Sequence, residues 1–117
     1  MNQYTEFKKT YLRLKEDFMR RSKLFISGPV SGLPYKEAAI RFNAAANMAS
    51  QIGFVPVNPI RLCCPIWSWW RCMAVCLWHL LWCDAVLFLR GWDMSRGARI
   101  EHRVAELLGK VIMYEEV

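Results

Sequence analysis

Apolar residues along the chain follow two spacings, one typical of strands and the other typical of helices. Short apolar runs bounded by turn residues predict four strands, over residues 23–27, 54–58, 85–89 and 111–114. Apolar positions three and four apart predict four helices, over residues 4–20, 35–51, 68–82 and 97–108. Gly53 and Gly109 are expected to end the second and fourth helices, and residues 59–67 are expected to form a loop.

Strands and helices alternate from residue 23 onward, and this alternation is typical of a parallel sheet flanked by helices. We therefore expect one α/β domain over residues 23–117, with four or five parallel strands. Pro56 lies inside the second strand and favours an edge position, because proline cannot donate to a neighbouring strand. Residues 1–22 precede the domain as a helical extension that packs on the domain or on a partner.

Two loops follow strands and lead into helices, and both contain residues suited to binding. The loop after the first strand reads SGPVSG, over residues 27–32, and the loop after the third strand reads GWDMSRG, over residues 91–97. Because parallel strands end at one edge of the sheet, both loops should border a single cleft. A helix start at Gly97 offers free backbone N–H groups to an anion. Glu101 follows one turn later and brings a carboxylate to that cleft.

Charge and composition exclude some classes of protein. The formal charge is +6, but residues 1–23 carry seven Lys and Arg against three Asp and Glu, which leaves the rest of the chain only mildly basic. No basic stripe interleaved with aromatic residues occurs, so no nucleic-acid partner is expected. Five cysteines at irregular spacing do not form a disulfide framework, and residues 1–23 lack the apolar core of a signal peptide. We expect a cytoplasmic protein with reduced thiols.

The helix over residues 68–82 contains a row of cysteines and a histidine that could suggest zinc. Cys72, Cys76, His79 and Cys83 lie on one helix face, and Cys63 and Cys64 precede them. The spacing matches no standard zinc pattern, and free cysteine behaves as a small buried apolar residue. We favour a core role for these residues and expect no metal and no other cofactor.

Five tryptophans crowd the same helix and the residues just before it: Trp67, Trp69, Trp70, Trp78 and Trp82. A small domain cannot bury a helix that is apolar on nearly every side, so we expect a homo-oligomer interface here. The nearly continuous apolar stretch from residue 72 to 89 is also long enough for a membrane span. His79 and Asp84 inside it argue against that interpretation, and a helix followed by a buried strand is favoured.

Four segments resemble small proteins of the nucleoside 2-deoxyribosyltransferase-like superfamily, in particular its short phage and prophage branch, the DUF4406 domain. These segments read FISGPVSGL over residues 25–33, VNP over 57–59, CDAV over 83–86 and LRGWDMSRGARIE over 89–101. The resemblance covers residues 23–115 and implies a flavodoxin-like three-layer domain, often oligomeric. It also implies cleavage or transfer at the N-glycosidic bond of nucleosides or their 5′-monophosphates.

The resemblance further implies roles for particular residues. Glu101 matches the superfamily's nucleophile, which attacks the anomeric carbon and forms a glycosyl ester that water or a second base resolves. Ser95 and Gly97 match residues that hold the sugar or 5′-phosphate, and the first loop lies beside them. The expected substrate-binding residues are Ser27, Gly28, Pro29, Ser31, Gly32, Asp93, Ser95, Arg96 and Gly97.

One position departs from the pattern of these relatives. Many of them carry an aspartate eight residues before the position of Asp84, where it assists departure of the base, and this chain has Cys76 there. Asp84 itself is expected to be structural, and Asp93 could substitute only if its loop folds inward. Loss of proton donation slows such reactions by roughly 10²–10⁴-fold. The sequence therefore leaves three functions open. The leading one is a glycosidase or transferase that uses Glu101, the second is a nucleotide-sequestering protein without turnover, and the third is an assembly module driven by the tryptophan-rich helix.

Overall fold

The chain folds around a four-stranded parallel sheet, as a computed structural model shows. The structure describes residues 5–13, 22–30, 34–63 and 66–115. The strands are β1 (Lys23–Ser27), β2 (Val55–Val57), β3 (Ala85–Phe88) and β4 (Val111–Tyr114), in the order β2-β1-β3-β4. Every neighbouring pair is parallel, with Leu24 opposite both Pro56 and Ala85. The predicted α/β fold with a parallel sheet is confirmed, and β2 occupies the edge that Pro56 indicated.

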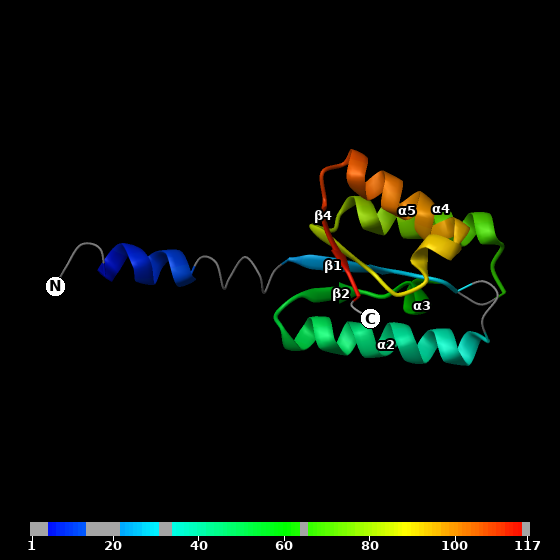
Figure 1. Cartoon of the computed structure of the whole chain (residues 1–117), viewed down its shortest axis with the longest axis horizontal. Helices are drawn as coiled ribbons and strands as arrows, with labels where there is room; N and C mark the ends of the chain where they lie inside the picture. Colours follow the sequence, from blue (N-terminus) through cyan, green and yellow to red (C-terminus); the bar gives the residue numbers. More distant parts are fainter. Residues whose placement is uncertain (1–4, 14–21, 31–33, 64–65, 116–117) are drawn as a thin grey trace.

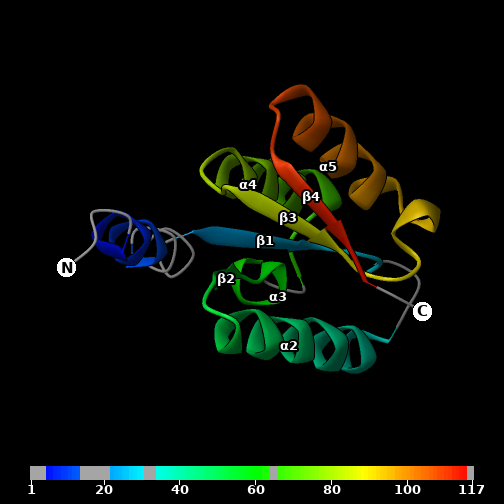
Figure 2. The ribbon, with the colours of Figure 1, turned by 60° about the vertical axis from the view of Figure 1, so that its left-hand side comes forward.

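Helices cover both faces of the sheet and give the domain three layers, as Figures 1 and 2 show. Helix α2 (Tyr35–Gln51) packs on one face, whereas α4 (Trp69–Leu81) and α5 (Arg96–Leu107) pack on the other. Successive strand residues alternate between these two cores because side chains point to opposite sides of a strand. On β1, Leu24 and Ile26 face α2, whereas Phe25 faces α4 and α5. This layering is that of a flavodoxin-like domain.

The helix boundaries follow from residues that cap the helix ends. Ser68 and Ser95 accept hydrogen bonds from the backbone N–H groups of Arg71 and Ala98, which starts α4 and α5 at the next residue. Gly53 and Gly109 adopt the left-handed backbone that closes the preceding helices, with φ of 107° and 68°. These helices therefore agree with the predicted ones to within a residue or two.

Two short helices occupy segments that the sequence presented as loops. The predicted loop over residues 59–67 begins with α3 (Pro59–Leu62), because the Asn58 side chain accepts from the Ile60 N–H and Pro59 starts a helix readily. The Asn58 amide also donates to Asn43 on α2 at 2.8 Å, which ties α3 to that helix. The loop after β3 contains a 3₁₀ turn, η1 (Trp92–Met94), entered through Gly91 at φ 89°. The sequence signal for α3 was the pair Asn58-Pro59, which starts the helix. It was missed because the helix is only four residues long.

The extension before the domain is helical over residues 5–13, while residues 4 and 14–20 of the predicted helix lie outside the described residues. Every residue of this helix is exposed, including Phe7, Tyr11 and Leu12. The prediction that it packs on its own domain is therefore wrong for these residues. In Figure 1 this helix lies apart from the sheet and the helices that cover it. Packing on a partner stays a prediction.

The apolar stretch from residue 72 to 89 divides into α4 and the buried strand β3. Across the described ranges, no helix combines the length and the apolar character that a membrane crossing requires. Asp84 separates the two elements: its carboxylate accepts from the Lys23 N–H at 3.1 Å, and its backbone pairs with β1 and β4. The structural role predicted for Asp84 is confirmed.

Candidate functional site

A pocket of about 350 Å³ opens at the carboxyl ends of β1 and β3, within the usual size of small-molecule sites. Ser27 and Gly28 line it from the end of β1, and Ser95, Gly97, Ala98 and Glu101 line it from the start of α5. The two loops that the sequence placed at one sheet edge therefore border one cleft, as predicted. Pockets at this edge are typical of open parallel sheets.

Glu101 is a buried carboxyl group in the pocket wall, with 6% of the residue exposed. It stands on the same face of α5 as Gly97 and Ala98, because residues three and four apart align on a helix. The Ser27 hydroxyl donates to its Oε1 at 3.4 Å. Its Oε2 has no hydrogen-bond partner among the described residues, and no ion pair formed by those residues involves Glu101. One carboxyl oxygen thus remains available to a ligand.

Burial raises the pKa of the Glu101 carboxyl from 4.5 to about 8, and the Ser27 hydrogen bond opposes this only in part. The cause is loss of hydration, since no cation among the described residues counteracts it. At neutral pH the carboxyl of the free pocket therefore holds its proton. A carboxyl group whose pKa lies this close to neutrality in a cleft is a candidate functional group.

The first loop contributes two of its five predicted residues to the pocket wall, Ser27 and Gly28. Gly28 has a packing reason of its own, because a Cβ there would lie 2.9 Å from the Cβ of Leu89. Pro29 is half-buried beside Gly91 and does not line the pocket, so its predicted contact with substrate is not supported. Ser31 and Gly32 lie outside the described residues.

The second loop divides between the pocket and its rim. Ser95 and Gly97 line the pocket, where the first-turn N–H groups of α5 have no acceptor within the helix. The exposed Arg96 lies outside, in a shallow depression that Ser95 and Gly97 also border. Its guanidinium stands 4.7 Å from the centre of the Trp69 ring. Asp93 is exposed on η1 and lines neither cavity, so its predicted contact with substrate is not supported.

The opposite wall is apolar and was not predicted. Helix α4 presents Trp69, Cys72, Met73 and Cys76 to the pocket, at steps of three and four that place them on one face. Further apolar and aromatic groups complete the wall: Tyr35, Phe42, Ile60, Cys63 and Trp67. In the structure these four residues share one face of α4. In the sequence that face could not be distinguished, because residues on nearly every side of the helix are apolar.

The structure offers no second acid beside Glu101. Among the described residues that line the pocket, Glu101 is the only carboxylic acid. Cys76 lies there instead, buried, and burial followed by the nearby Glu101 raises the pKa of its thiol. Such a thiol is a weak proton donor. Asp93 does not replace it, because its loop does not fold inward.

The cysteine row divides between the core and the pocket. Cys76 and Cys83 belong to the apolar cluster that α4 forms with the sheet, which confirms the core interpretation for these two. Within the ranges that the structure describes, no three His, Cys, Asp or Glu side chains are placed to hold a metal ion.

Comparison with known families identifies the domain. A family model described as "Domain of unknown function (DUF4406)" matches residues 22–114, which is most of the chain. The chain therefore belongs to the DUF4406 family. No curated protein matches it.

Proposed function

We propose that this DUF4406 protein breaks the N-glycosidic bond of a nucleoside or nucleoside 5′-monophosphate, with the Glu101 carboxylate as the nucleophile. The observation that carries the proposal is the buried Glu101 carboxyl, with Oε2 unpartnered, in a pocket at the end of a parallel sheet. An unsatisfied buried polar atom costs free energy and calls for a functional explanation. The resemblance to nucleoside 2-deoxyribosyltransferase-like proteins over residues 89–101 supports the same role.

The two walls suit the two parts of a nucleoside. The aromatic and apolar wall of Trp67, Trp69 and Phe42 can stack against a nucleobase. The polar wall at the start of α5 offers hydroxyl and N–H groups to the sugar, and Arg96 stands at the rim where a 5′-phosphate would end. This pose puts the anomeric carbon between the walls, beside Glu101.

The reaction then proceeds in two displacements. Glu101 attacks the anomeric carbon, the carbon–nitrogen bond breaks, and the base leaves with that electron pair and takes a proton from solvent. Water or a second base next attacks the glycosyl ester and frees Glu101. Since attack needs the carboxylate, the free protein reacts faster as pH rises toward the pKa of Glu101, about 8.

Incubation with a panel of deoxynucleosides and their monophosphates tests the proposal, with free base measured by chromatography. We expect base release that Glu101→Gln abolishes. Glu106→Gln is the matched control, because Glu106 lies on the same helix, is exposed and pairs with His102 outside the pocket. Equal release by wild type and Glu101→Gln refutes the role of Glu101.

A second function, nucleotide sequestration without turnover, is favoured by one observation: Cys76 occupies the place of a proton donor in the pocket. In that case the protonated Glu101 donates a hydrogen bond to the ligand instead of attacking it. Calorimetry with the same panel separates the two functions. Tight binding with no base released by wild type favours sequestration.

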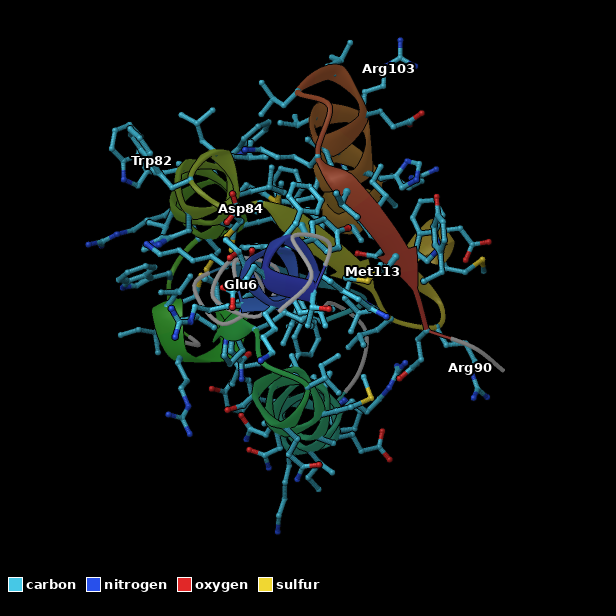
Figure 3. All side chains as sticks on the ribbon, turned by 90° about the vertical axis from the view of Figure 1, so that its left-hand side faces the viewer. Glu6, Trp82, Asp84, Arg90, Arg103 and Met113 are labelled. Carbon is cyan, nitrogen blue, oxygen red and sulfur yellow. The ribbon has the colours of Figure 1, made fainter. Side chains whose placement is uncertain are left out.

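We also propose that the protein forms a homo-oligomer through the outer face of α4. Trp70, Trp78 and Trp82 are 70%, 61% and 62% exposed, and Trp82, the residue directly after α4, projects outward in Figure 3. Together they offer roughly 450 Å² of aromatic surface, over half of the ~800 Å² that one partner of a stable dimer buries. A second copy presenting the same face supplies the complement.

Sedimentation tests this interface with a double substitution, Trp78→Ser and Trp82→Ser. We expect the wild-type protein to be oligomeric at micromolar concentration and the variant to be monomeric. Ile40→Ser is the control, because Ile40 is equally exposed on α2, across the sheet. A monomeric wild type would refute the interface.

A further inference from the structure

The apolar wall of the pocket contains a close pair of thiols from two different elements. The Sγ atoms of Cys63 and Cys76 are 3.8 Å apart, and both residues line the pocket. Cys76 is fixed in the middle of α4, whereas Cys63 is the residue directly after α3. The pair therefore joins a long helix to the end of a helix of only four residues.

The geometry favours a bond between these two sulfurs. A disulfide requires the sulfurs to approach to about 2 Å. Cys63 has extended backbone with φ −110° and ψ 138°. Its Sγ is 3.8 Å from the Sγ of Cys76 and 3.8 Å from the carbonyl oxygen of Cys72. A shift at the end of α3 closes the remaining gap, while α4 keeps its place in the core.

We propose that Cys63 and Cys76 form a redox modification site, in which a peroxide converts the two thiols into a disulfide within the pocket wall. The Cys63 thiol gives its proton to solvent, and the thiolate attacks one oxygen of hydrogen peroxide. The O–O bond breaks, the departing hydroxide takes up a proton, and the products are a sulfenic acid and water. Cys76 then attacks the sulfenic sulfur and expels a second water. Two electrons pass from the sulfurs to the peroxide, and the sum is two thiols and H₂O₂ giving one disulfide and two waters.

The order of the two steps follows from exposure. Cys63 is partly exposed and Cys76 is buried, so peroxide reaches Cys63 first. Burial raises the pKa of the Cys63 thiol to about 11 and raises that of Cys76 more strongly, so Cys63 forms a thiolate more readily than Cys76 does. Cys76 acts second, on a sulfur already held beside it.

The bond would alter the surface that a ligand meets. Both sulfurs line the same pocket as Glu101, and their union draws the end of α3 toward α4. The redox state of the chain then changes the shape of the wall opposite Ser95 and Glu101. This inference does not rest on the proposed reaction, because the bond is detected without any ligand.

Peroxide treatment of the full, freshly reduced chain tests the site. We expect the titratable thiols to fall from five to three and the intact mass to fall by two hydrogen atoms, both reversed by dithiothreitol. Trypsin cuts after Arg61 and Arg71, so Cys63 and Cys76 fall in separate peptides that the disulfide joins. Fragmentation of the joined peptides identifies the two linked cysteines.

Substitutions assign the link. The single variants Cys63→Ser and Cys76→Ser should each abolish the link. The double variant, Cys64→Ser with Cys72→Ser, should keep it, and so should the single variant Cys83→Ser. If either pocket variant fails to fold by circular dichroism, the double variant still decides, because only Cys63, Cys76 and Cys83 remain in it. A link that survives loss of Cys63 or Cys76, or uptake of oxygen by wild type without any link, overturns the proposal.

Discussion

The two walls of the pocket are built by neighbouring helices and carry opposite chemistry. The α5 wall combines a capping serine, a helix start and a buried carboxyl, and it can hold and attack a polar ligand. The α4 wall consists of indole rings, thiols and a thioether. It can enclose a ligand, but it has no carboxyl group to react with that ligand. The contrast separates two requirements of catalysis, because a pocket can keep its nucleophile while losing its proton donor. Under the proposed function, turnover therefore depends on the α4 wall.

Restoring an acid to the α4 wall should give the largest effect. Cys76→Asp places a carboxyl beside Glu101, where it can protonate the departing base. We expect base release to rise by roughly 10²–10⁴-fold. Cys76→Asn has the same size without the proton and serves as the control. Base release is measured by chromatography. Equal rates for Cys76→Asp and Cys76→Asn would show that the lack of an acid at this position does not limit the reaction.

Replacing Glu101 of the α5 wall with glutamine should stabilise the fold at high pH. The unfolded Glu101 ionises near pH 4.5, but the folded carboxyl keeps its proton up to about pH 8. Stability therefore falls by on the order of 5 kcal/mol as pH rises between these two values, and it is level above them. Glu101→Gln should lack this decline. Urea unfolding of both proteins from pH 4 to 9 measures it, and parallel curves would show that Glu101 is not buried as described.

Adding a methyl group at Gly28 should disturb the polar side more than adding one at Gly97. At Gly28 the new Cβ meets the Cβ of Leu89 at 2.9 Å, which cannot move without the backbone. At Gly97 it meets the Met73 sulfur at 3.0 Å, which can rotate away. We expect Gly28→Ala to cost about 1–3 kcal/mol and Gly97→Ala less. Thermal unfolding of the two variants compares them, and a reversed order contradicts this packing.

Removing the Ser27 hydroxyl should give the smallest effect. Ser27→Ala takes away the hydrogen bond that holds the pKa of Glu101 down, so that pKa rises further and any Glu101-dependent rate shifts to higher pH. The stability cost should be about 1 kcal/mol. A rate profile of Ser27→Ala that coincides with wild type would show that the hydroxyl does not act on Glu101.

The same contrast explains how far the sequence could be interpreted. The α5 wall was predictable, because Ser95, Gly97 and Glu101 lie close together along the chain and strand order alone brings Ser27 to them. The α4 wall was not, because an almost wholly apolar helix shows no preferred face in its sequence. The predicted role of Asp93 gains no support, because Asp93 is exposed on η1 and does not line the pocket.

The fold shows the same division between local and distant information. Capping serines, closing glycines and alternating strand residues located the sheet and its three long helices. The short helix α3 depends on Asn58 bonding both Ile60 and Asn43, and the second of these partners is set by the fold. The helix over residues 5–13 is exposed, although its sequence is amphipathic. An amphipathic pattern therefore predicts a helix but does not identify the surface on which that helix packs.

The most direct test of the role of Glu101 is the pH dependence of kcat/KM for base release from the best substrate of the panel. If the Glu101 carboxylate is the nucleophile, log kcat/KM rises by one per pH unit and levels above about pH 8, and Glu101→Gln releases no base. A flat profile, an active Glu101→Gln protein, or a wild type that releases no base at any pH would contradict that role.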